Sequence, residues 1–490
     1  MVVGLEREII DQAAYNRNIE SVHAAGVTLP RIADLADPAN NLADRTALLA
    51  DVDPDTPAAG NLFRVHWHNG PSRRHLVDVP AHIVLDTALT GVDAKIIIAV
   101  GDRFPMVRAH KVLAAYGCLV PRLLSGVFDV SRHRAVWPST GNYCRGGVAI
   151  SRILGCRSVA VLPEGMSRER FQWLENWTTD PADILRTPGT ESNVKEIYDA
   201  CHALSKDPEN IILNQFAEFG NYIIHRAVSG PAFERMFKAV KGSSDLKARA
   251  FVSATGSAGT IAAGDYLKDT LGAQVCAVEA TECPTLLYNG YGEHNIQGIG
   301  DKHVPFIHNV MNTDFVIGVS DQASDNLNLL FNTTTGRKYL SERAGMDQQS
   351  ITALGDLGLS SIANIVGAIK YAKYMGLKSD DAVLTVATDG AEMYETELSG
   401  AEKRLGGGGF DALKAAEVYG RHMLGAATDH MIELDRAGHE RIFNLGYYTW
   451  VEQQGVELSD FEARRDQAWW DGLMDLVPAW DGMIDKFNSA

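Results

Sequence analysis

The sequence has few cysteines for its length, and they are not arranged as metal ligands or as a disulfide framework. Its 490 residues include six cysteines, none of them in a CxxC pair or beside a cluster of histidines. His66 and His68 are spaced to share one face of a strand, but two histidines without a third ligand are more often structural. The sequence therefore predicts reduced, mostly buried thiols and no bound metal.

Positive charge and long apolar stretches are also scarce. Lysine and arginine total 45 against 62 acidic residues, a formal net charge of -17. Such a charge repels nucleic-acid backbones and anionic lipids, so we expect neither as a partner. The first ten residues include Glu6, Arg7 and Glu8 instead of an apolar signal region, and no apolar run has transmembrane length. We therefore expect a cytoplasmic protein that acts on a small molecule.

The middle of the chain has the alternating pattern of a parallel α/β fold. From residue 93 onward, short β-branched runs alternate with helical stretches. The clearest strand candidates are residues 96–100, 158–162, 248–253, 274–278 and 382–386. The glycines from Gly406 to Gly409 indicate a linker, after which the chain is predicted to be largely helical. We expect a core over residues 86–400, with extensions over residues 1–85 and 401–490.

A loop of small residues follows the predicted strand at 248–253. It consists of Gly256, Ser257, Ala258, Gly259 and Thr260 and precedes a predicted helix. Backbone N–H groups at the start of a helix suit a phosphate dianion, but the motif alone fits a tight turn without a ligand equally well. A dinucleotide-binding loop is a more specific alternative, because the acidic residue Glu279 follows the glycine loop at the spacing that is typical of such sites. Ala258 nevertheless replaces the second glycine of the GxGxxG pattern, which weakens this interpretation.

Two further segments carry groups that could act with this loop. The motif Ser139-Thr-Gly-Asn142 precedes a helix-like run at 146–154. Its hydroxyl and backbone donors can hold a carboxylate, and an asparagine can reach a cofactor oxygen, although a simple helix cap is the alternative. Lys111 starts an otherwise apolar helix. Partial burial would lower the pKa of its amine and make it a competent nucleophile, although most such lysines reach solvent.

In chain order, these segments resemble the fold type II pyridoxal-phosphate enzymes of the cysteine synthase and cystathionine β-synthase family. The similarity spans roughly residues 95–400. Further matching segments are 162–170, 214–216, 221–231, 294–300 (HNIQGIG), 358–361 and 385–390. The resemblance implies a two-domain α/β fold like that of the tryptophan synthase β-chain. A smaller domain over about 115–230 would be inserted in the larger one, and the protein would be a homodimer.

The resemblance also implies a role for each site residue. Lys111 would hold pyridoxal phosphate as an imine and then remove the substrate α-proton. Asn142 would contact the phenolic oxygen of the cofactor, and Thr388 or Asp389 would face the pyridine nitrogen, a choice that the sequence leaves open. The cofactor phosphate would lie on Gly256, Ser257, Ala258, Gly259 and Thr260. The substrate carboxylate would lie near Ser139, Thr140, Tyr143, Gln215 and Gly298.

These roles predict a β-replacement through an aminoacrylate intermediate, in which an activated serine takes up sulfide or a thiol. A β-elimination that releases pyruvate and ammonia, as in a cysteine desulfhydrase, uses the same residues, so the sequence leaves both open. The absence of GxGxxG disfavours a nicotinamide oxidoreductase. Tyr143 stands where the family usually has a threonine, and Ala109 and Leu113 replace a serine and an arginine around the lysine. We therefore expect an altered substrate pocket.

Overall fold

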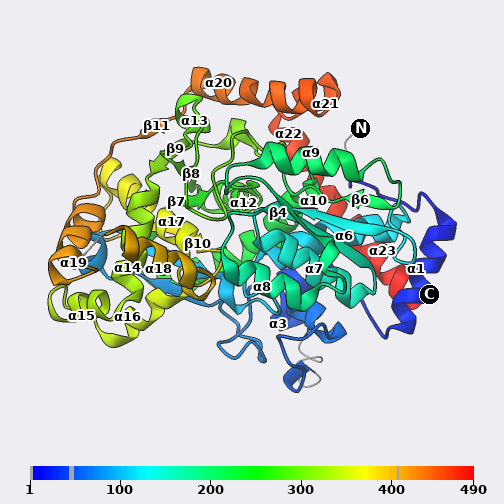
Figure 1. The fold of residues 1–490 in the computed structure, drawn as a ribbon, viewed down its shortest axis with the longest axis horizontal. Helices are drawn as coiled ribbons and strands as arrows, with labels where there is room; N and C mark the ends of the chain where they lie inside the picture. The colour runs from blue at the N-terminus through cyan, green and yellow to red at the C-terminus, as the bar shows by residue number, and fades with distance from the viewer. Residues whose placement is uncertain (1–3, 43–48, 406–407) are drawn as a thin grey trace.

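The computed structural model describes residues 4–42, 49–405 and 408–490. They form two sheets with helices packed around them (Figure 1). The larger sheet has the strand order β1-β2-β10-β7-β8-β9-β11. Its five central strands are parallel, whereas the edge strands β1 and β11 are antiparallel to their neighbours. The strands are β1 (His82–Val84), β2 (Lys95–Val100), β7 (Lys247–Ala254), β8 (Gln274–Ala280), β9 (Phe315–Val319), β10 (Asp381–Ala387) and β11 (Met431–Glu433).

The smaller sheet is built entirely from the chain between β2 and β7. Its order is β5-β4-β3-β6 and all its strands are parallel. They are β3 (Arg134–Pro138), β4 (Arg157–Pro163), β5 (Ile184–Thr187) and β6 (Asn210–Ile212). Side chains alternate between its faces. Trp137 points into the main core on the side of α7 (Asn142–Leu154), and Val136 packs with Ile197 of α9 (Val194–Leu204) on the other side.

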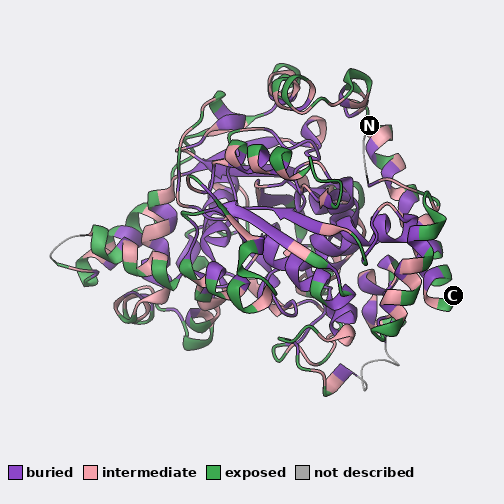
Figure 2. Ribbon diagram, turned by 45° about the vertical axis from the view of Figure 1, so that its right-hand side comes forward, coloured by how far each residue is buried: buried purple, intermediate pink, exposed green. Residues whose placement is uncertain are grey.

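Helices cover both faces of the larger sheet, so the buried parts of its central strands are mainly apolar. α17 (Leu359–Tyr374) crosses one face, and α11 (Gly230–Lys241) and α12 (Ile261–Leu271) cover the other. Figure 2 shows the strands of the interior as buried. The other helices of the core are α5 (Thr87–Thr90), α6 (Lys111–Ser125), α8 (Arg168–Trp177), α10 (Phe219–Ile224), α13 (Thr285–Tyr288), α14 (Asp321–Asn332), α15 (Thr334–Glu342), α16 (Gln348–Ala353) and α18 (Glu395–Arg404).

The two ends of the chain pack against each other. Trp480 donates from Nε1 to the carbonyl of Glu6 at 2.8 Å, and Asn488 exchanges two hydrogen bonds with the backbone of Leu29. In Figure 1 the first helix, in blue, and the last, in red, lie at the same end of the molecule. The terminal helices are α1 (Gln12–Ala24), α2 (Ile32–Ala36), α3 (Pro38–Asn41), α19 (Ala412–Val418), α20 (Arg436–Tyr447), α21 (Leu458–Ala463), α22 (Gln467–Gly472) and α23 (Leu476–Ser489).

All five predicted strands are present, each one or two residues longer than predicted. The α/β class and the mainly helical C-terminal segment are confirmed, and β11 is the exception within that segment. Gly406 and Gly407 of the predicted linker lie outside the described residues, and the predicted domain boundaries stay predictions. Within the described ranges, no single helix is long and apolar enough to cross a membrane; Gln348–Asp356 and α17 pass that test only as a pair bent by 118°.

Candidate active site

Lys111 is the first residue of α6, and its amine lies between two other segments of the predicted site. Nζ donates to Ser257 Oγ at 3.0 Å and to Gln215 Oε1 at 3.2 Å. Burial lowers the pKa of this amine to about 8. An appreciable fraction of the amine is therefore neutral near neutral pH, which is the state that a nucleophile or a base requires.

The glycine loop between β7 and α12 leaves its backbone donors unused. No N–H group from residue 256 to residue 260 has a hydrogen-bond acceptor among the described residues. A Cβ at Gly256 would lie 2.6 Å from the carbonyl oxygen of Gly298, and one at Gly259 would lie 2.3 Å from Asn221 Oδ1. Glycine is therefore required at both positions. Free N–H groups at the start of an 11-residue helix form a suitable cradle for a phosphate dianion.

Left-handed backbone occurs at three non-glycine residues in the loops on either side of the Lys111 amine. Met106 and Arg108, just before Lys111, have φ angles of 61° and 52°, and Ala258 in the glycine loop has φ 62°. Such conformations are unfavourable for residues with a Cβ and persist where the surrounding structure demands them, often at functional sites.

Asn142 begins α7, and its side-chain amide is held at both ends. Nδ2 donates to Asp389 Oδ2 at 2.7 Å, and Oδ1 accepts from Arg145 at 2.9 Å. Gly141 before it has φ 144°, a conformation that favours glycine. These contacts join the motif at 139–142 to the loop that follows β10.

Thr388 and Asp389 have different surroundings. Thr388 lines the space beside Lys111, and its Oγ1 lies 3.2 Å from His110 Nε2. Asp389 is completely buried away from that space, where it accepts a 2.9 Å hydrogen bond from Tyr394 and lies 3.7 Å from the guanidinium of Arg170. Of the two residues, Thr388 is the one in position to reach a cofactor ring.

Two small cavities, each of about 20 Å³, flank Lys111. The first extends along the glycine loop to Ser360 and Asn364 of α17. The second is lined by Ser139, Thr140, Asn142, Tyr143, Gln215, Phe216 and Asp301. Both are bordered by Lys111, Gly256, Ser257, Gly298 and Thr388. The structure thus brings together all the predicted site residues except Asp389, which lines neither cavity.

Two buried carboxyl groups near this site were missed by the sequence analysis. Asp301 lines the second cavity with Lys111, and burial raises its pKa well above the ordinary value. Glu191 lies beside Thr140 and Gly298, and burial raises its pKa to about 7. Asp301 directly follows the 294–300 motif, which could have indicated it. Glu191 belongs to no recognised motif.

This set of donors fits pyridoxal phosphate. The unused N–H groups suit its phosphate, the Lys111 amine suits its aldehyde, and Asn142 and Thr388 lie where side-chain donors could meet the ring.

Comparisons with known proteins agree with this assignment. The family model described as pyridoxal-phosphate dependent enzyme matches residues 101–330. Cysteine synthase B of Campylobacter jejuni is 30% identical over 253 residues, which cover 51% of this chain and 74% of that protein. Cysteine synthase A of Escherichia coli is 26% identical over 277 residues, 54% of this chain and 76% of that protein.

Solved structures with the same fold include two bacterial enzymes. A hydrogen sulfide-producing enzyme from Fusobacterium nucleatum superimposes with a TM-score of 0.53 at 21% identity and covers 64% of this chain and 96% of its own. An O-acetylserine dependent cystathionine β-synthase from Helicobacter pylori superimposes with a TM-score of 0.52 at 20% identity. The superposition covers 64% of this chain and 94% of that protein. At this identity they support the fold alone. Together with the sequence match to cysteine synthase B, they lead to the conclusion that this chain belongs to the fold type II pyridoxal-phosphate enzymes of the cysteine synthase and cystathionine β-synthase family.

Proposed function

We propose that this enzyme catalyses a β-replacement that joins sulfide or a thiol to the β-carbon of an activated serine. The observation that carries the proposal is the position of the Lys111 amine, 3.0 Å from Ser257 in the glycine loop and 3.2 Å from Gln215. The name of the relative that is 30% identical, cysteine synthase B, supports the same reaction. The product would be cysteine or a similar amino acid.

The residues around Lys111 have separate proposed roles in binding the cofactor and the substrate. We assign the cofactor phosphate to the free N–H groups at 256–260, and we assign Asn142 and Thr388 to the cofactor ring. When bound, pyridoxal phosphate supplies an electron sink for the negative charge that develops at the substrate α-carbon. We assign the substrate carboxylate to Ser139, Thr140, Tyr143, Gln215 and Gly298.

The Lys111 amine is the proposed base that removes the α-proton. With its pKa lowered to about 8, it can accept a proton and release it again near neutral pH. The contacts to Ser257 and Gln215 position Nζ between the phosphate cradle and the substrate side of the site. Closure of the 139–142 loop over the substrate would exclude water and so protect the reacting β-carbon from hydrolysis.

A β-elimination that cleaves a cysteine-like substrate is the second candidate, and Asp301 is the observation that favours it. A thiolate leaves more readily when an acid protonates it, whereas acetate leaves without such help. Burial raises the pKa of Asp301 well above its ordinary value, which favours the protonated acid, and Asp301 lines the same cavity as Lys111. It is therefore placed to donate a proton to a departing sulfur.

The two reactions can be separated with purified holoenzyme. O-acetylserine is supplied with and without sulfide, and cysteine and pyruvate are measured in each case. Sulfide-dependent cysteine with little pyruvate supports the replacement. Pyruvate formed without sulfide, together with pyruvate from cysteine itself, supports the elimination. Lys111→Ala should lose normal turnover of either kind.

We further propose a cytoplasmic homodimer with no nucleic-acid or membrane partner. All six cysteines are free and buried, as is usual for proteins in a reducing compartment. The net charge of -17 opposes binding to anionic polymers and surfaces. Light scattering of the purified enzyme tests the dimer, and a monomeric mass would refute it.

A further inference from the structure

A separate cavity of about 310 Å³ lies at the carboxyl ends of β8 and β9. Thr281 follows β8, and Ser320 follows β9. Residues of α17 form one wall, and the C-terminal segment 421–430 forms another. The cavity shares no residue with the two that flank Lys111. Carboxyl ends of parallel strands are the usual location of ligand sites in open α/β sheets.

Lys370 of α17 is the buried cation of this cavity, and its charge is already balanced. Lys370 is 5% exposed, and its Nζ donates to the carbonyl of Gly318 at 2.8 Å and to Asp429 at 3.1 Å. Lys370 therefore anchors the C-terminal segment to the core and adds little net charge to the cavity.

Arg421 and His422, in contrast, line the cavity without a hydrogen bond or a close ion pair among the described residues, although the charge of Glu417 acts on both. Both belong to the short π-helix η9 (Tyr419–Leu424), and among the residues that the structure describes neither has a hydrogen bond or an ion pair. Glu417, one turn earlier, is paired with Lys414 at 2.8 Å instead. Burial, assisted by the charge of Arg421, lowers the pKa of His422 to about 4, so its ring is neutral and can donate one N–H. A free guanidinium beside this donor suits an oxyanion.

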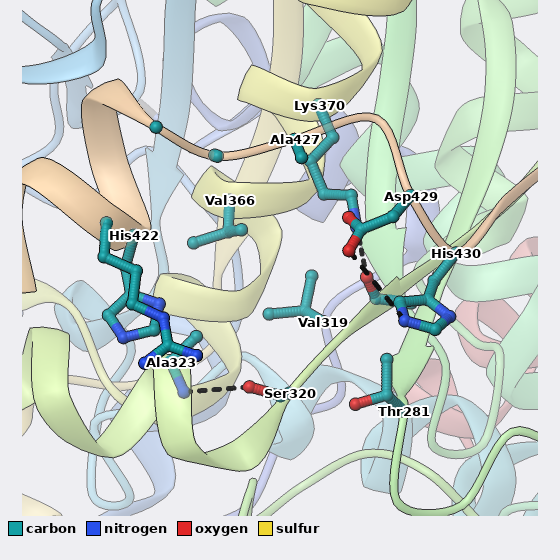
Figure 3. A pocket seen from close by; sticks show the side chains of 14 residues that line it. Thr281, Val319, Ser320, Ala323, Val366, Lys370, His422, Ala427, Asp429 and His430 are labelled. Carbon is teal, nitrogen blue, oxygen red and sulfur yellow. Dashed lines mark hydrogen bonds and ion pairs between the residues drawn. The ribbon is translucent and has the colours of Figure 1, made fainter.

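The middle of the cavity is apolar. Figure 3 shows His422 on one side and Asp429 and His430 on the other, with Val319 and Val366 between them. Ala323, Ala426 and Ala427 add only methyl groups. α14 begins at this wall, but Glu282 accepts from the N–H of Asp321 and Ser320 accepts from that of Ala323, so the donors left for a ligand are those of Arg421 and His422.

We propose that this cavity binds a small organic anion. Its carboxylate or phosphate group lies against Arg421 and His422, and its short apolar body lies on Val319 and Val366. The site depends on the C-terminal segment, which lies outside the part of the chain that the family model matches. α17 connects it to the catalytic region, because Ser360 and Asn364 of the same helix line a cavity beside Lys111.

Calorimetric titration of the holoenzyme at constant ionic strength tests the proposal. The probes are inorganic phosphate and succinate, and bound cofactor keeps phosphate away from the glycine loop. Loss of a charged hydrogen-bond partner should weaken binding by about tenfold or more in Arg421→Ala. Arg436→Ala, an exposed arginine of the same segment that does not line the cavity, is the matched control. Ala427→Leu should also weaken binding, because the larger side chain fills part of the cavity.

Saturable binding of phosphate that is weakened in Arg421→Ala but not in Arg436→Ala would assign the site to phosphorylated ligands. The same pattern with succinate would assign it to carboxylates. The proposal is overturned if neither probe saturates, or if wild-type enzyme and Arg421→Ala bind equally well. Equal weakening in both arginine variants would also overturn it, since that result indicates general charge attraction.

Discussion

Asn142 and Asp389, 247 residues apart in the chain, share a buried hydrogen bond of 2.7 Å. Asp389 also accepts from Tyr394 and lies 3.7 Å from the guanidinium of Arg170. Both charged side chains are completely buried. The carboxylate of Asp389 therefore balances the charge of Arg170 and fixes Asn142 at the edge of the site, while Thr388 beside it lines the site itself.

Removal of the charge of Asp389 should destabilise the fold. Asp389→Asn keeps the size of the side chain but removes the carboxylate that pairs with buried Arg170, and the loss of one partner of a buried pair costs about 3–5 kcal/mol. Urea denaturation should show this decrease in the free energy of unfolding. Asp356→Asn is the control, because Asp356 pairs with Arg103 at 2.9 Å in a more exposed place and should cost about 1 kcal/mol or less. Equal losses would contradict the account.

The burial of Lys111 should make the stability of the cofactor-free protein depend on pH. The pKa falls from 10.5 when unfolded to about 8 when folded, so between these values the unfolded chain binds more protons. Stability then rises with pH over this window. Lys111→Met removes the amine, so the variant should be more stable than wild type at neutral pH. This difference in the free energy of unfolding should shrink by about 1–3 kcal/mol from about pH 7 to about pH 10. Lys486→Met, at an exposed position, should show no such trend.

The glycine loop should tolerate no side chain at Gly259. A methyl group there would meet Asn221 Oδ1 at 2.3 Å, and overpacking of this kind costs about 1–3 kcal/mol. Gly259→Ala should therefore weaken binding of pyridoxal phosphate by about tenfold or more, measured by fluorescence titration of cofactor-free protein. Gly472→Ala, whose methyl group would meet no atom within 4 Å, is the control. Unchanged affinity in Gly259→Ala would show that the phosphate lies elsewhere.

Asp301 should matter more for cleavage of cysteine than for its synthesis. Asp301→Asn removes an acid that could protonate a departing sulfur, and general acids contribute about a hundredfold or more to such steps. Pyruvate formation from cysteine should fall by that amount, while cysteine formation from O-acetylserine and sulfide should change less than about tenfold. Glu293→Gln, at an exposed position, is the control. Parallel losses in both reactions would assign Asp301 a structural role instead.

Much of the large sheet could be predicted because its central strands contain short runs of apolar residues, which are typical of strands buried on both faces. β2, with its run of three isoleucines, is the clearest case. β11 has only three residues, two partly buried and one exposed, so no periodic pattern indicated it. It forms because β9 offers an edge for pairing.

The parts of the site that depend on a motif were also predictable, whereas contacts between distant segments were not. Lys111, the 139–142 motif and the glycine loop each have a local signature. Thr388 and Asp389 are neighbours at the end of a strand, where successive side chains point to opposite sides, so the sequence could not assign one of them to the site. Glu191 joins the site only because the fold brings its segment beside Thr140 and Gly298.

We expect Lys111 to bind the cofactor covalently. Borohydride reduction of the purified holoenzyme, followed by peptide mass spectrometry, tests this attachment. The expected result is a phosphopyridoxyl group on Lys111, and loss of that label in Lys111→Ala. A label on another lysine, or no label on a protein that retains bound cofactor, would contradict it.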